Sequence, residues 1–219
     1  WMTADDHGQA QDSPVFLKCP MTHSACTADA PGIVYWFRND LRLHDNPALQ
    51  SAVAQAQQLN TWLLPVYVHD SALLAPSPWG FARTSPHRLQ WTAMAVDDVA
   101  EQLASLGSRL LELEGDPSAV LARLMQQSGA TVLVCEEIAA PWEQAQIAAL
   151  KKQGVAVQTV WQSSWMDPGS LPFAPQDVPD QFSSFRRAVE RHGAQAATPA
   201  PAVTHLPALP EPRVLDAAL

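Results

Sequence analysis

The sequence predicts an α/β fold: a Rossmann-like, doubly wound, five-stranded parallel sheet of order 3-2-1-4-5 with helices on both faces. Two observations predict it. Five short apolar runs alternate with helix-forming stretches, which is the rhythm of βαβ units. These runs are mostly apolar throughout, as expected of strands that are covered on both faces. The chain has 219 residues, of which 47% are hydrophobic, and this is enough for one such domain with tails.

Composition also bounds the function. The net charge of −9 argues against direct nucleic-acid binding by this chain alone, since a phosphate backbone calls for clustered Lys and Arg. No apolar run is long enough for a membrane span. Three cysteines (Cys19, Cys26 and Cys135) give no disulfide framework and favour a reducing, cytoplasmic setting. Residues 1–32 show no signal peptide, and we expect a disordered or non-native tail there, without a zinc site at Cys19 and Cys26.

The first strand is predicted over residues 33–37, a buried run of β-branched and aromatic side chains. Asn46 occupies an N-cap position and Pro47 the first helical position, so a helix is expected over 48–58. A second apolar run, 61–69, is predicted as the next strand, with Pro65 as an awkward residue for a central strand.

The second half of the predicted domain repeats this alternation. A long helix is expected over residues 86–106, where apolar residues recur every three or four positions and Gly107 follows as a C′ residue. Asp116 is the expected cap of the next helix. The remaining elements are predicted as a strand at 109–113, a helix at 117–127, a strand at 131–135, a helix at 141–153 and a strand at 155–161.

Beyond residue 162 the alternation stops. We interpret 33–162 as the α/β domain, 163–191 as an interdomain-type linker and 192–219 as a Pro/Ala-rich tail. Residues 1 to about 30 and beyond about 195 are expected to be dispensable for folding, because they lack apolar periodicity.

Opposite charges crowd the loop that follows the first strand: Arg38, Asp40, Arg42 and Asp45. In an open α/β sheet this edge is where ligands bind. The alternative is a loop that is salt-bridged only for its own shape. In either case we expect Arg38 to pair with Asp45 across the turn.

A second acidic pair, Glu136 and Glu137, follows the fourth strand, which the predicted order places beside the first. These carboxylates either accept hydrogen bonds from a flat heteroaromatic ligand or form a solvated loop end. Residues 38–46 contain no glycine, which disfavours a conventional dinucleotide or ATP phosphate cradle. No nucleophile elbow and no histidine pair with metal-ligand spacing is present, so we assign no catalytic residue and no metal.

The run WFRNDLRLHDNPAL at residues 36–49 closely resembles the opening signature of the DNA photolyase/cryptochrome family. The segments TSPHR at 84–88 and GDP at 115–117 are most similar to the DASH branch of that family. Residues 171–190 resemble the family's bridge into its second domain. The resemblance covers residues 33–191 and implies the family's N-terminal α/β antenna domain.

In the intact family, a folate or deazaflavin antenna absorbs a photon and passes energy to FAD, which then repairs a pyrimidine dimer. The resemblance implies a reduced folate (methenyltetrahydrofolate) or a deazaflavin here, with Glu137 as the best-aligned antenna contact and Glu136, Arg38 and Asp40 beside it. Trp142 is expected to cover the chromophore ring. FAD is expected only with a separate helical, FAD-binding photolyase domain as partner, which is not found within these 219 residues.

Two functions therefore remain open. One is the light-harvesting part of a photolyase or DASH-type cryptochrome, a lyase family, with this chain alone not catalytic. The other is a stand-alone small-molecule-binding or protein-interaction module without catalysis.

Overall fold

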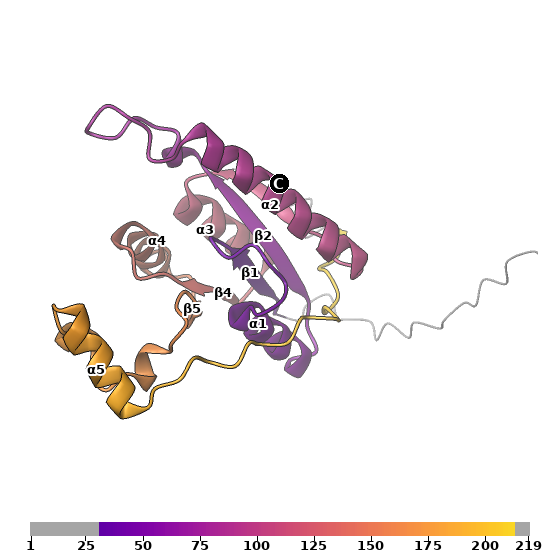
Figure 1. Ribbon diagram of the computed structural model, residues 1–219. Helices are drawn as coiled ribbons and strands as arrows, with labels where there is room; N and C mark the ends of the chain where they lie inside the picture. The colour runs from indigo at the N-terminus through magenta and orange to yellow at the C-terminus, as the bar shows by residue number, and fades with distance from the viewer. Residues whose placement is uncertain (1–30, 213–219) are drawn as a thin grey trace, which may run out of the picture.

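The structure is a computed structural model that describes residues 31–212. Its centre is one parallel sheet with strand order β3-β2-β1-β4-β5, which confirms the predicted topology (Figure 1). The strands are β1 (Ile33–Phe37), β2 (Leu63–Asp70), β3 (Leu111–Gly115), β4 (Val132–Glu137) and β5 (Val157–Trp161). Because the order reverses between β1 and β4, the carboxyl ends of these two strands form the switch point of the sheet.

Helices cover both faces of the sheet. One face carries α1 (Pro47–Gln58) and α2 (Pro86–Ser105), and the other carries α3 (Pro117–Ser128) and α4 (Pro141–Lys152). Side chains alternate along each strand, so β4 sends Val134 toward α1 and α2 and Cys135 toward α3 and α4. The result is two separate hydrophobic layers, one on each side of the sheet.

Local signals set the ends of the helices. The Asn46 side chain accepts a hydrogen bond from the backbone N–H of Leu49 at 2.9 Å, and Asp116 does the same for Ala119 at 2.8 Å, so both predicted caps are confirmed. Gly107 follows α2 with φ +76°, a left-handed conformation that glycine adopts without strain.

Pro65 is accommodated inside a central strand. It lies opposite Tyr35 of β1, while pairing with β3 begins only at Val66 and Leu111. Its missing N–H therefore falls before the β2–β3 ladder starts and removes no bond on that side.

The chain after β5 holds more structure than the sequence suggested. Two 3₁₀ turns, η2 (Pro168–Ser170) and η3 (Pro175–Asp177), lead to helix α5 (Phe182–His192). Figure 1 shows α5 standing apart from the sheet, and the yellow segment after it running back across α1. Residues 197–210 of that segment, here called the strap, pack against the domain.

The strap makes defined contacts with the domain, which differs from the expected unstructured tail; that the tail is dispensable for folding stays a prediction. Val203 and Leu206 pack against the layer under α1 and α2, and Leu209 packs against the layer on the opposite face. The Pro- and Ala-rich composition was misleading because backbone bonds to distant residues hold this segment, and composition does not report them.

The expectations for residues 1–30, including those for Cys19 and Cys26, lie outside the described residues. Among the helices of residues 31–212, none has the length and apolar character that crossing a bilayer requires.

Candidate functional site at the carboxyl edge of the sheet

Arg38 follows β1 and is 8% exposed. It leaves the strand on the face covered by α4, where its guanidinium lies 4.5 Å from the Trp36 ring centroid. It donates to the backbone carbonyls of Glu136 and Glu143 at 3.3 and 3.2 Å and to Oε1 of Gln146 at 3.0 Å. Burial lowers the pKa of Arg38, and the nearby acidic groups oppose this change. Arg38 thus holds the end of β1 against β4 and α4.

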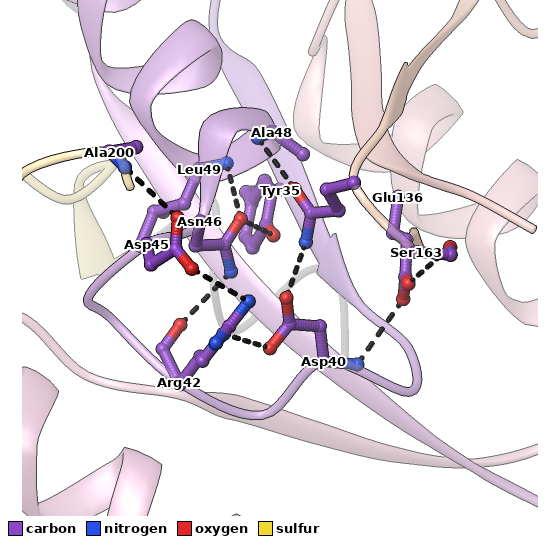
Figure 2. Close-up of polar contacts among 11 residues, drawn as sticks. Tyr35, Asp40, Arg42, Asp45, Asn46, Ala48, Leu49, Glu136, Ser163 and Ala200 are labelled. Atoms are coloured by element: carbon purple, nitrogen blue, oxygen red, sulfur yellow. Dashed lines mark hydrogen bonds and ion pairs between the residues drawn. The ribbon is translucent and has the colours of Figure 1, made fainter. Parts of the chain in front are cut away.

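Asp40 and Glu136 meet on the opposite face. Glu136 is buried, and its Oε2 accepts a hydrogen bond from the backbone N–H of Asp40 at 3.2 Å. Its Oε1 accepts from the Ser163 hydroxyl at 2.8 Å, as Figure 2 shows. Asp40 forms an ion pair with Arg42, in which Oδ1 lies 2.8 Å from Nε, and its Oδ2 accepts a hydrogen bond from Gln162 Nε2 at 2.8 Å. Burial raises the pKa of both carboxyl groups.

The expected pair between Arg38 and Asp45 is wrong. Asp45 lies 3.5 Å from Arg42 and accepts from the Ala200 backbone N–H at 2.9 Å. The physical reason is side-chain alternation: Arg38 shares the face of Trp36, while the loop that carries Asp45 turns toward α1.

Glu137 lies next to Glu136 in sequence but on the other face of the sheet. It pairs in register with Trp161 of β5, and its Oε2 accepts from Thr159 Oγ1 at 3.2 Å. It borders an open space of about 640 Å³, here called the Glu137 hollow. The other walls of this hollow are mainly apolar and include Ala139, Trp161, Met166, Leu171, Val178 and Phe185.

The structure therefore divides the four predicted contact residues. Asp40 and Glu136 are joined to each other and to Ser163 and Gln162, while Glu137 alone reaches the hollow. The expectation that Glu137 would lie together with Arg38 and Asp40 is not met. Successive strand residues point to opposite faces, which separates Glu137 from Asp40 and Glu136. Arg38 is on the same face as Glu137, but its guanidinium is bound by the Glu136 and Glu143 carbonyls and by Gln146 and does not line the hollow.

Trp142 is also placed differently from the expectation. It lies on α4 with the Arg83 guanidinium 3.9 Å from its ring centroid, and it is not part of the wall of the Glu137 hollow. The aromatic residue beside Glu137 is Trp161, whose indole N–H donates to Ser164 at 2.7 Å.

A second cavity, of about 240 Å³, lies at the carboxyl ends of β1, β2 and β3 beneath the start of α2. We call it the β2 crevice. Its lining includes Arg38, Tyr67, His69, Asp70, Leu89 and Trp91. Arg38 and Asp70 are connected through Gln146, whose side chain accepts from Arg38 and donates to Asp70 at 3.0 Å each.

Sequence reasoning missed Trp161, Gln162 and Ser163. All three stand at or just past the end of β5, which is the same sheet edge as Glu136 and Glu137. The signal was available, since a tryptophan followed by polar residues ends a strand at the edge where parallel sheets bind ligands. Within residues 31–212, no group of three His, Cys, Asp or Glu side chains comes together in a way that could hold a metal ion.

Comparison with known proteins agrees with the fold. The DNA photolyase family model matches residues 33–206. Cryptochrome DASH of Gloeobacter violaceus is 33% identical over 184 residues, covering 81% of this chain and 35% of the relative. Blue-light photoreceptor PHR2 of Arabidopsis thaliana is 34% identical over 176 residues, covering 78% of this chain and 38% of the relative.

Among solved structures, a cryptochrome of Synechocystis superposes with a TM-score of 0.77 at 31% identity, covering 83% of this chain and 38% of that one. The chain spans about a third of the length of the curated relatives it matches. The family match over most of the domain, the DASH relatives and the shared sheet identify this chain as a member of the DNA photolyase family, corresponding to the N-terminal α/β domain of photolyases and DASH cryptochromes.

Proposed function

We propose that this domain binds a light-harvesting chromophore, a reduced folate such as methenyltetrahydrofolate, in the Glu137 hollow. The observation that carries the proposal is the Glu137 carboxylate at the border of a mainly apolar space, beside the Trp161 indole; the second carboxylate in the lining, Asp167, accepts from the Gly169 backbone N–H at the start of η2. Ligand sites in proteins combine apolar walls with a small number of polar groups in this way.

The chemistry of a pterin fits these walls. Its amino-pyrimidine edge presents adjacent N–H donors, and a carboxylate offers two acceptor oxygens. Thr159 donates to only one oxygen of Glu137. Trp161, Met166 and Phe185 supply polarizable side chains for the flat ring system.

The role in light harvesting follows from the family. The bound chromophore would absorb a photon and pass its excitation to FAD, held by a helical photolyase domain that acts as the partner of this one. Electron transfer to a pyrimidine dimer would then belong to that flavin domain, so the part proposed for this chain is the antenna step.

A deazaflavin antenna is the second candidate, and the β2 crevice is the observation that favours it. This crevice is smaller, at about 240 Å³, and it places the Arg38 cation beside the Tyr67 ring and the Asp70 carboxylate. A fused ring that carries acidic or carbonyl oxygens would find donors there.

An interaction module is the third candidate. Trp79, Phe81 and Trp91 are 76%, 64% and 65% exposed, and the first two stack with ring centroids 6.4 Å apart. Exposed aromatic groups of this kind favour a protein surface as partner.

Two matched substitutions separate these candidates. Ala139→Trp should fill the Glu137 hollow, and Ala93→Trp should fill the β2 crevice, since each alanine lines its cavity. Titration of methenyltetrahydrofolate, followed by fluorescence, should show binding that Ala139→Trp abolishes and Ala93→Trp leaves unchanged. Deazaflavin binding that Ala93→Trp abolishes and Ala139→Trp leaves unchanged would support the β2 crevice. No binding of either compound would favour the interaction module.

Glu137→Gln tests the named contact. The amide keeps the size of the side chain but loses the charge and one acceptor, so we expect weaker folate binding by about 1.5–3 kcal/mol, the range for a hydrogen bond to a charged group. Glu114→Gln, at the β2 crevice, is the matched control and should bind as the wild type does. Equal affinities for Glu137→Gln and wild type would remove Glu137 from the site.

A further inference from the structure

The strap is docked through hydrogen bonds at both ends. At its start, Asp45 and Ala200 form a reciprocal pair, in which the Asp45 N–H donates to the Ala200 carbonyl at 3.0 Å and Ala200 donates to the Asp45 carboxylate at 2.9 Å. At its end, the Leu63 N–H donates to the Ala208 carbonyl at 3.0 Å. Asp45 has φ +47°, a left-handed conformation in which Asp is among the better-tolerated residues.

Between these ends the strap runs the length of one sheet face. Asp45 stands near the carboxyl end of β1, whereas Leu63 opens β2 at the opposite edge. Val203 and Leu206 pack with the α1–α2 layer on the way, and Leu209 reaches the other layer. The strap therefore contacts both hydrophobic layers of the domain.

The start of the strap is tied to the wall of the Glu137 hollow by two routes. The direct route is the Ala197 N–H, which donates to the Trp165 carbonyl at 3.2 Å. The second route passes from Asp45 through Arg42 to Asp40, whose carboxylate accepts from Gln162 (Figure 2). Both routes end on the segment 162–166, which contributes Ser164 and Met166 to the hollow.

The wall of the hollow is an excursion of the chain between two attachments. It leaves the sheet at Trp161, passes through η2, η3 and α5, and returns to the sheet only with the strap. Within it, Phe185 of α5 packs on Phe173 with ring centroids 5.5 Å apart and also faces the hollow. A wall that is held at both ends keeps its shape, whereas one released at the strap keeps only the attachment at the end of β5 and the bonds of Gln162 and Ser163 that follow it.

We propose that the strap is a positioning element for the Glu137 hollow: its docking and the 162–166 segment form one cooperative unit, so that strap seating and chromophore binding favour each other. The chromophore part of this statement rests on the proposed function. By linkage, the factor by which strap seating improves binding equals the factor by which the chromophore stabilises the seated strap.

Amide hydrogen exchange in the full chain measures strap seating directly. The reporters are the amides of Leu63, Ala200 and Val203, which bond across the strap contact. The paired substitution Val203→Ala and Leu206→Ala should speed exchange at these amides and weaken methenyltetrahydrofolate binding by about fivefold or more, the lower end of typical coupling between sites. His205→Ala, at an exposed strap position, should change neither quantity.

Two further measurements keep the proposal testable. If the paired variant does not fold, Asp45→Asn serves in its place, since Asn keeps the acceptor for Ala200 and tolerates the left-handed conformation but removes the charge that Arg42 faces. Gln162→Ala and Ser163→Ala should speed strap exchange without any ligand, because they loosen the other half of the unit.

The outcomes separate the two proposals. A loosened strap with unchanged folate affinity overturns the coupling, and so does unchanged strap exchange in Gln162→Ala and Ser163→Ala. Faster strap exchange in those variants, combined with no folate binding by the wild type, supports the cooperative unit and contradicts only the proposed function.

Discussion

Glu136 and Glu137 are neighbours in the chain, yet they belong to different kinds of site. Glu136 is 5% exposed, and its two oxygens accept from Asp40 and Ser163. Glu137 is partly exposed, its side-chain carboxylate accepts from Thr159, its backbone carbonyl accepts from Ser163, and it borders an open, mainly apolar space. The difference arises from the alternation of a strand, which sends one side chain to each face.

This comparison shows that charge at the switch point of a sheet does not by itself mark a ligand site. The loop after β1 holds the densest set of charges at this edge, but its members bind one another and shape the loop. The better candidate for binding is the position where the Glu137 carboxylate meets mainly apolar walls, because its remaining acceptors are available to a ligand.

The largest expected effect on stability comes from replacing Arg38, a buried residue that bonds the end of β1 to β4 and α4. Arg38→Ala removes a buried cation and leaves the carbonyls of Glu136 and Glu143 and the Gln146 amide oxygen without their donor. We expect a loss of roughly 2–3 kcal/mol in the free energy of unfolding, the range for hydrogen bonds to a charged group and for buried acceptors left unsatisfied.

Urea unfolding measures this loss, and Arg42→Ala is its control. The Arg42 side chain is 38% exposed and pairs with Asp40 and Asp45 at the surface of the loop, so its removal should lower stability by no more than about 1 kcal/mol. Equal losses for the two variants would show that burial does not distinguish them.

The pH dependence of stability tests the burial of Glu136 in a second way. Because burial raises the pKa of Glu136, the folded protein keeps this proton to a higher pH than the unfolded chain does. Stability should therefore fall as pH rises between the ordinary carboxyl pKa, about 4.3, and the raised value, and it should recover on acidification.

Glu136→Gln should reduce this decline, and Asp40→Asn should reduce it further, since burial raises the pKa of Asp40 as well. The measurement is the free energy of unfolding in urea at a series of pH values from 4 to 8. A decline that is as steep in the double variant as in the wild type would contradict the assignment to these two groups.

Much of the fold could be predicted because its determinants are local. The caps at Asn46 and Asp116 and the C′ glycine at 107 act within one helical turn, and the apolar runs of a doubly covered sheet are visible in any window. The strand order followed from the βαβ rhythm.

The strap and the site could not be predicted in the same way, because they depend on contacts between distant residues. Val203, Leu206 and Leu209 recur every third residue, but nothing local shows which sheet face they meet. Glu136 and Glu137 point to opposite faces because β4 extends to Glu137, whereas the sequence pattern predicted that this strand ends at Cys135. Helix α5 had a visible signal in the spacing of Phe182, Phe185 and Val189, which was not used.

The smallest expected effect comes from removing one hydroxyl donor from each carboxylate. Ser163→Ala takes the hydroxyl from Oε1 of buried Glu136, and also from the Glu137 backbone carbonyl. Thr159→Val takes the hydroxyl from Oε2 of Glu137 with little change in shape. Glu136 is buried, so the loss of stability should be about 1–2 kcal/mol, within the range for an unsatisfied buried group. The second carboxylate borders open space and can bind water instead, so Thr159→Val should change stability by no more than about 0.5 kcal/mol. Paired urea unfolding curves at pH 7 decide the matter. If Thr159→Val lowers stability as much as Ser163→Ala does, the oxygens of Glu137 are committed to the fold as fully as those of Glu136, and the hollow loses the free acceptor on which chromophore binding depends.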